Sequence, residues 1–470
     1  MSRTAAAALS AATAALLLPG SAQAAGGQLA HDLPVWAAAP FAVLLLCIAL
    51  LPLVAEHWWE RNQNKAIVAA VIAVPFLGWL VSTFGYAALP DLGHAAMEYV
   101  SFLSLIGALF VLSGGIFIRG SLGGTPLGNT GLLAFGAVIA NVVGTTGASM
   151  LLLRPLLRAN RQRQRKTHIV VFFIFIVSNC GGLLTPLGDP PLYLGFLKGV
   201  PFEWTLQLWK EWALVNGILL LVFNFIDQSV LAKEEASSSK RHIFEELQHH
   251  QKLGVEGLPS ALLLAGVVLA VLGKGQGWFY GGEPWPFGVQ ESILILLAFV
   301  GYRITAPELR KKNEFSFGPI IEVAVVFAGI FATMVAPLAL LNAHGKELGL
   351  EHPWHYFWAT GLLSSFLDNA PTYLAFASAA AGQAGIAAEG RYLGELLASG
   401  GEAEAIMLAI SCGAVMMGAN TYIGNGPNFM VKAMAEQHGV KMPSFFGYML
   451  WSGAVLIPTF VVVSLVFFKP

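Results

Sequence analysis

The segment Ser178-Asn-Cys-Gly-Gly-Leu-Leu-Thr-Pro-Leu-Gly-Asp-Pro-Pro191 lies within an apolar run that extends from about residue 169 to 197. An apolar run of this length is typical of a membrane-spanning helix, for which about 20 residues suffice. The glycines and prolines of the segment are incompatible with one unbroken helix. Inside a membrane, broken backbone is tolerated only where protein buries it or where it lines a wet cavity. With Asp189 at the break, the segment predicts an ion or substrate site like those of secondary transporters.

The same pattern occurs a second time in the chain. The segment Gly418-Ala-Asn-Thr-Tyr-Ile-Gly-Asn-Gly-Pro427 matches Gly182–Pro191 at a constant offset, because glycine, threonine, glycine, an Asp or Asn, and proline all coincide. Upstream of each copy lies another polar interruption, at Asn141–Met150 and at Ser365–Tyr373. Two copies of one unit in the same order predict an internal duplication.

The composition is typical of a membrane protein. Hydrophobic residues make up 56% of the chain and charged residues 11%, whereas soluble domains carry about 25% charged residues. The apolar runs are long and do not alternate, which favours a helical bundle over a barrel. The formal net charge is −1, so nothing indicates nucleic acid as a partner. The three cysteines show neither metal-ligand spacing nor a disulfide framework.

Lys and Arg on the short loops set the expected orientation of the spans. If residues 129–153 crossed the bilayer completely, the basic loop Arg154–Lys166 would face outward, so we expect a re-entrant hairpin that turns at Gly144–Gly147. Each arm of about a dozen residues is roughly 18 Å long, enough to reach mid-membrane and return. Residues 356–380 are expected to form a second hairpin of opposite orientation. The predicted fold class is an all-α polytopic membrane protein with two inverted-topology repeats, each with a re-entrant helical hairpin and a broken transmembrane helix.

The sequence also predicts how the chain is divided. Residues 1–24 have the features of a cleavable signal peptide, which together with the spans predicts a multi-pass protein of the bacterial inner (cytoplasmic) membrane. The expected segments after it are an extra N-terminal transmembrane helix (25–65), the first repeat (66–231, hairpin 129–153, broken helix 169–197), a cytoplasmic linker (232–257), an extra transmembrane helix and outer loop (258–288), and the second repeat (289–470, hairpin 356–380, broken helix 404–431).

Three motifs carry a family resemblance. At Asn141–Met150, Thr185–Pro191 and Phe366–Thr372 the sequence resembles the ion transporter superfamily, and within it the branch of NhaD-type sodium:proton antiporters and citrate transporter-like proteins. The similarity covers most of the chain after the signal peptide. It implies scaffold and transport domains, commonly in a homodimer, with sites at the two hairpin tips and the two broken helices. The carboxylate carriers typically show Ser-Asn-Thr at both tips, whereas this chain has Gly144-Thr-Thr146 and Asp368-Asn-Ala370.

A sodium site needs hard oxygen ligands, which are freed carbonyls, hydroxyls, amide oxygens and carboxylates. The candidate ligands in the first half are Thr145, Thr146, Asn179, Thr185 and Asp189. Those in the second half are Asp368, Asn369, Thr372, Asn420, Thr421 and Asn425. For the two aspartates the alternative is an N-cap role, because an Asp shortly before proline is typical of a helix start. For the threonines and asparagines the alternative is that they satisfy broken backbone.

The charges at these positions favour a cation as the substrate. No Lys or Arg lies in the hairpin tips or helix breaks, so a multivalent anion would face Asp189 and Asp368 without a fixed counter-charge. Charged side chains within a membrane are costly and are usually functional or paired. Na⁺ and H⁺ competing for one carboxylate would give antiport, so the sequence predicts a Na⁺/H⁺ exchanger that works by alternating access. No cofactor is expected beyond the transported Na⁺.

Three other functions remain as alternatives. The first is Na⁺-coupled symport of citrate or a dicarboxylate on the same scaffold, with an organic anion as a further partner. Arsenite efflux on this scaffold is the second. An enzyme is disfavoured, because no nucleophile–base pair and no His-Glu-x-x-His motif occurs in any predicted span.

Overall fold

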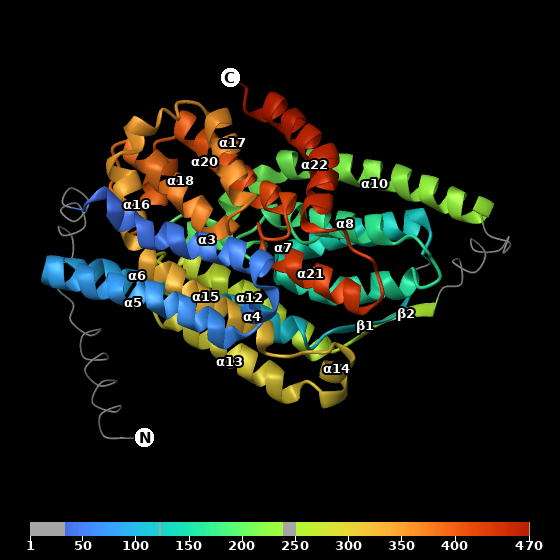
Figure 1. The fold of residues 1–470 in the computed structure, drawn as a ribbon. Coiled ribbons are helices and arrows are strands. Elements are labelled where there is room, and N and C mark those ends of the chain that lie inside the picture. The colour runs from blue at the N-terminus through green and yellow to red at the C-terminus, as the bar shows by residue number, and fades with distance from the viewer. Residues whose placement is uncertain (1–32, 122–123, 238–250, 470) are drawn as a thin grey trace.

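The computed structural model describes residues 33–121, 124–237 and 251–469, and this part of the chain is almost entirely helical (Figure 1). Within it, seven helical segments are long and apolar enough to cross a membrane. The number is eight if α15 (Gly318–Thr333) and α16 (Val335–Ala343), bent by 44°, count as one span. The predicted all-α polytopic membrane fold is confirmed. The predicted signal peptide, residues 1–24, lies outside the described residues.

The elements follow the order of the two repeats. In the first half they are α3 (Ala39–Val54), α4 (Glu56–Trp59), α5 (Asn62–Phe84), α6 (Leu89–Ser113), β1 (Phe117–Ser121), α7 (Pro126–Ala159), α8 (Thr167–Ile176), α9 (Pro190–Leu197) and α10 (Trp209–Ser237). In the second half they are β2 (Gln251–Glu256), α12 (Leu258–Gln276), α13 (Val289–Ile304), α14 (Pro307–Lys312), α15, α16, α17 (Pro353–Ser364), α18 (Asn369–Gln383), α19 (Tyr392–Ala398), α20 (Glu402–Met417), α21 (Gly426–Gln437) and α22 (Phe445–Phe467).

The helices pack in two groups according to their contacts, and we call these groups the lower and upper layers. The lower layer holds α3, α5, α6, α12, α13 and α15, and the upper layer holds α7 to α10, α17, α18 and α20 to α22. Helix α5 exposes Ile67, Val71 and Val74 on its outer side. Because lipid accepts apolar side chains and α5 satisfies its own backbone, this surface is suited to a bilayer.

Helix α8 is the central element of the upper layer. Every side chain from His168 to Val177 is at most 3% exposed. A helix that is apolar on all sides is buried on all sides, and α8 packs against α7, α10 and α21. The break that follows α8 is therefore held in the interior of the protein.

The first hairpin is formed by the two arms of α7. The chain changes direction at Gly144, whose φ of 78° and ψ of 155° lie outside the helical region. The side chains of Asn129 and Asn160 exchange hydrogen bonds of 3.0 and 2.7 Å, although an unbroken helix would separate these residues by roughly 46 Å. Helices α17 and α18 form the counterpart, in which the Tyr356 hydroxyl donates to Gln383 Oε1 at 2.5 Å.

The segment predicted as a cytoplasmic linker, 232–257, has regular structure at both ends. Helix α10 continues to Ser237, and Gln251–Glu256 forms strand β2, which pairs antiparallel with β1. The sequence predicts no strands. Two strands of five and six residues are too short to show a clear alternation, and their partners are far apart in the chain.

A buried ion-pair network fastens the open end of the first hairpin. Arg163 contacts Asp227 and Glu234 at 2.8 Å each, and His168 Nε2 lies 2.8 Å from Asp227. Asn129 Nδ2 donates to the other Asp227 oxygen at 2.9 Å. All five residues are at most 4% exposed. The network therefore joins the hairpin, the start of α8 and helix α10.

Removing one partner of this network should destabilise the fold strongly. A buried charge left without its partner costs about 3–5 kcal/mol, so we expect Asp227→Ala to lower the free energy of unfolding by this amount. The measurement is the Tm of the purified protein in detergent. The matched control is Glu436→Ala, which breaks a partly exposed 3.0 Å pair with Lys432 and should cost less than about 0.5 kcal/mol. Equal shifts for the two variants would contradict a clamping role for the network.

Candidate ion-binding site

Both helix breaks contain the same close approach of backbone. The first lies between α8 and α9, and the second lies between α20 and α21. A Cβ added to Gly188 would lie 2.1 Å from the carbonyl oxygen of Gly182, and one added to Gly424 would lie 2.6 Å from that of Gly418. These glycines occupy equivalent positions in the two repeats. The packing at each break therefore requires glycine, which explains why the glycines coincide in the two copies.

Each break is also tied to the hairpin tip of its own repeat. The Thr185 hydroxyl donates to the Asn141 carbonyl at 2.5 Å, and the Thr421 hydroxyl donates to the Ser365 carbonyl at 2.5 Å. These two predicted ligands therefore satisfy broken backbone, which was the alternative interpretation for them. Their equivalent contacts show that the two repeats share one local structure.

Asp189 lies at the N-cap position of α9, but its carboxylate does not cap that helix. Its Oδ1 accepts hydrogen bonds from the Thr145 hydroxyl at 2.7 Å and from the Asn425 amide at 3.1 Å. Its Oδ2 accepts one from the Asn369 amide at 2.5 Å. Asp189 is 1% exposed. A single buried carboxylate thus joins both hairpin tips and the second break.

This arrangement differs from the two separate sites of the sequence analysis, one in each half. Thr145 and Asn369 stand at equivalent places in the two hairpin tips, and both donate to Asp189. The half-sites meet because the two repeats pack face to face at their breaks. Residues from both predicted sites therefore form one centre.

Asparagines extend the centre into the second break. Asn425 Nδ2 also lies 3.1 Å from Asn179 Oδ1 and 3.2 Å from the Ser178 carbonyl oxygen. Asn179 in turn donates to Asn428 Oδ1 at 2.7 Å. Asn428 and the Ser178 carbonyl are not among the ligands that the sequence predicts. Asn428 could have been found as a polar residue directly after Pro427, at the start of a helix within an apolar stretch.

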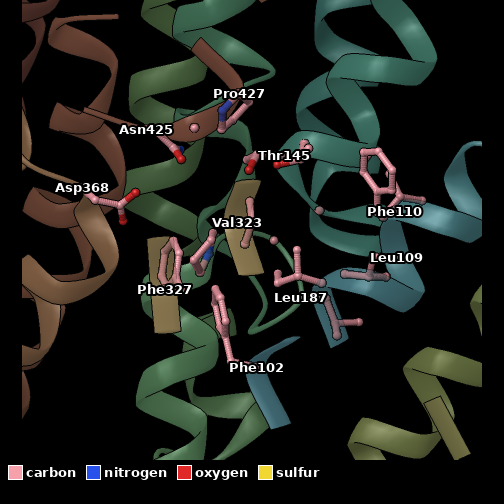
Figure 2. Close-up of a pocket in the computed structure, with 18 residues that line it drawn as sticks. Phe102, Leu109, Phe110, Thr145, Leu187, Val323, Phe327, Asp368, Asn425 and Pro427 are labelled. Carbon is pink, nitrogen blue, oxygen red and sulfur yellow. The ribbon is translucent and has the colours of Figure 1, made fainter. Parts of the chain in front are cut away.

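The second aspartate, Asp368, caps helix α18. Its Oδ1 accepts a hydrogen bond from the Ala370 backbone N–H at 3.1 Å, as the N-cap alternative predicted. The side chain is half-buried and lies at the wall of a pocket shared with Asn425 and Thr145 (Figure 2). Among the described residues, no basic side chain forms an ion pair with Asp368 or Asp189.

The remaining predicted ligands lie near the centre without contacting Asp189. Thr146 lines the pocket. The Thr372 hydroxyl donates to the Asp368 carbonyl at 2.9 Å. Asn420 Nδ2 donates to Ser365 Oγ at 2.9 Å, while its Oδ1 is buried without a hydrogen-bond partner.

The pocket lies where the upper layer meets the lower layer. Polar residues of the hairpin tips and the second break form one side, and Phe102 and Phe110 of α6 and Phe327 of α15 form the other (Figure 2). Its volume of about 60 Å³ is enough for a few water molecules. Gly188 and Pro190, the neighbours of Asp189, line it, and no described lining residue is basic. The pocket therefore reaches the backbone on both sides of Asp189, whose own side chain is buried behind this wall.

Two hairpins that face two broken helices, with a buried carboxylate where they meet, define the architecture of a secondary transporter. The chain matches the model of a family described as putative citrate transport over residues 30–468, and it belongs to that family. A search among curated proteins gave no match.

Proposed function

We propose that the protein is a sodium:proton antiporter, in which Na⁺ and H⁺ bind alternately at Asp189. The observation that carries the proposal is that this buried carboxylate has hydrogen bonds from neutral donors, namely Thr145, Asn369 and Asn425, and no ion pair with any described residue. An unpaired charge inside a membrane protein is costly and is typical of an ion pathway. Binding of either cation would neutralise it.

The surroundings of Asp189 favour a small cation over an organic anion. Asp368 adds a second carboxylate, at the wall of the pocket that Gly188 and Pro190, the neighbours of Asp189, also line. Hydroxyl, amide and carboxylate oxygens are the ligands that hard cations prefer. A citrate ion in this pocket would meet the carboxylate of Asp368 and would lie close to the buried Asp189, and no described lining residue is basic. Only the positive amino ends of helices α9 and α21 and any bound Na⁺ would attract citrate to this site.

Exchange follows if the centre is exposed to one side of the membrane at a time. When Na⁺ binds, Asp189 is deprotonated and its proton leaves on that side. After Na⁺ is released on the other side, Asp189 takes up a proton there and the centre returns. The pocket between the layers offers the route, because movement of the upper layer against the lower one would change the side to which it opens.

The placement of the protein is part of the proposal. We propose a multi-pass protein of the bacterial inner membrane, with the basic loop Arg154–Lys166 in the cytoplasm. The homodimer implied by the family resemblance is proposed with it.

Na⁺-coupled symport of citrate is the second candidate, and the description of the family favours it. Proteoliposomes with purified protein distinguish the two. If the protein is an antiporter, external Na⁺ should dissipate an imposed pH gradient, and labelled citrate should not accumulate. Citrate accumulation that requires a Na⁺ gradient, without proton movement driven by Na⁺ alone, would instead establish the symporter.

A further inference from the structure

The amide nitrogen of Asn425 faces more acceptors than it has hydrogens. It lies 3.1 Å from Asp189 Oδ1, 3.1 Å from Asn179 Oδ1 and 3.2 Å from the Ser178 carbonyl oxygen. A side-chain amide carries two N–H hydrogens. These four residues are at most 2% exposed. Three oxygen atoms therefore converge on one weakly positive group that cannot satisfy all of them fully.

These oxygen atoms are of the kinds that bind a hard cation. They are a carboxylate oxygen, an amide oxygen and a main-chain carbonyl oxygen. The Ser178 carbonyl follows the carboxyl end of α8, where the helix dipole is negative and favours a cation. Carbonyls at such helix ends coordinate Na⁺ in transporters with broken helices.

The equivalent position of the first repeat has the opposite surroundings. Asp189 corresponds to Asn425 in the two breaks, and both are N-cap residues of the helix that follows. Around Asp189 the hydroxyl of Thr145 and the amides of Asn369 and Asn425 point their hydrogens inward. Around the Asn425 nitrogen, oxygen atoms point inward. Of these two equivalent positions, the one occupied by the Asn425 nitrogen is therefore the one whose surroundings suit a cation.

We infer that the amide nitrogen of Asn425 occupies the position of the transported cation when no cation is bound. Na⁺ binds among the Ser178 carbonyl, Asn179 Oδ1 and Asp189 when the Asn425 side chain turns its nitrogen away. The amide keeps the three oxygen atoms hydrogen-bonded while the centre holds no Na⁺, and it sets how tightly Na⁺ binds. This inference rests on the proposed function and names the position and the controlling residue of the same site.

The test replaces the nitrogen of Asn425 with oxygen. In Asn425→Asp at pH 8.5, a carboxylate faces the three oxygen atoms, so a cation is needed to hold them together. We expect the half-saturating Na⁺ concentration for thermal stabilisation, with choline as the reference salt, to fall about tenfold below that of the wild type, because added ligand charge tightens cation binding. We also expect Na⁺ release, and with it exchange, to become slower.

Two further variants keep the test decisive. Asn216→Asp on α10 places the same carboxylate against a buried carbonyl, since Asn216 Nδ2 lies 3.2 Å from the Cys180 oxygen, and it should not strengthen the Na⁺ response. Asn425→Ser removes the nitrogen but supplies a hydroxyl oxygen, so it should bind Na⁺ at least as tightly as the wild type. If Asn425→Asp folds only with Na⁺ present, that result also supports the inference.

The inference is overturned if both Asn425 variants bind Na⁺ more weakly than the wild type, or if Asn216→Asp strengthens binding as much as Asn425→Asp. Failure of the proposed antiport would show separately, as wild-type liposomes in which Na⁺ moves no protons. Na⁺ binding measured by thermal stabilisation would still test the position of the cation in that case.

Discussion

Asp189→Asn is expected to reduce Na⁺-driven proton exchange about 100-fold or more. Loss of the charged ligand should weaken the binding free energy of Na⁺ by about 3 kcal/mol, and each 1.4 kcal/mol corresponds to a factor of ten. The reason is the position of this carboxylate, which is 1% exposed and accepts hydrogen bonds from both repeats. An amide at this position has no charge to exchange between Na⁺ and H⁺. The measurement is Na⁺-driven dissipation of a pH gradient in proteoliposomes.

The same variant should keep its fold. The Oδ1 of an asparagine at position 189 can still accept from Thr145 and Asn425. Its nitrogen would face Asn369, whose own Oδ1 is buried without a hydrogen-bond partner. Turning the Asn369 amide would supply an acceptor, so we expect a Tm close to that of the wild type. Glu436→Gln, at a partly exposed position on α21, is the control that should keep full exchange. Full exchange in Asp189→Asn would contradict this prediction and would mean that Asp368, rather than Asp189, couples Na⁺ movement to H⁺ movement.

The fold and the outline of the site follow from local features of the sequence. The glycines and prolines around Asp189 rule out an intact helix, and their recurrence around Asn425 gives the duplication. The basic loop Arg154–Lys166 indicates that the chain turns back near Gly144, and the structure has a positive φ at that residue. Each of these features depends on neighbours in the chain or on a direct comparison of two segments.

The composition of the centre could not be predicted in the same way. Whether Asn369 contacts Asp189 depends on how the second hairpin packs against the first break, and a pattern within either segment does not report that. Thr185, Thr421 and Asn425 are equally polar in the sequence. Only packing decides that the threonines satisfy carbonyl groups of the hairpin tips while Asn425 reaches the carboxylate.

The packing of the first break also determines the result expected for Gly188→Ala. The new Cβ would lie 2.1 Å from the Gly182 carbonyl oxygen, and because this atom belongs to the backbone, the break must open to admit it. Gly188 also accepts a hydrogen bond from Thr145 N–H at 2.8 Å, so the displacement would reach the hairpin tip and Asp189. We expect a loss of stability of about 3 kcal/mol, at the upper end for an overpacked interior, and loss of most Na⁺-driven exchange.

The control for this prediction is Gly217→Ala on α10, where an added Cβ meets open space. Because alanine favours a helix more than glycine does, this variant should keep exchange and show an unchanged or slightly higher Tm. Gly424→Ala makes the equivalent change in the second break, where the contact would be 2.6 Å, and should act in the same direction. Activity in Gly188→Ala together with inactivity in Gly424→Ala would mean that only the second break is rigid. The coupling between break and hairpin tip would then operate through Asn425 rather than through Thr145.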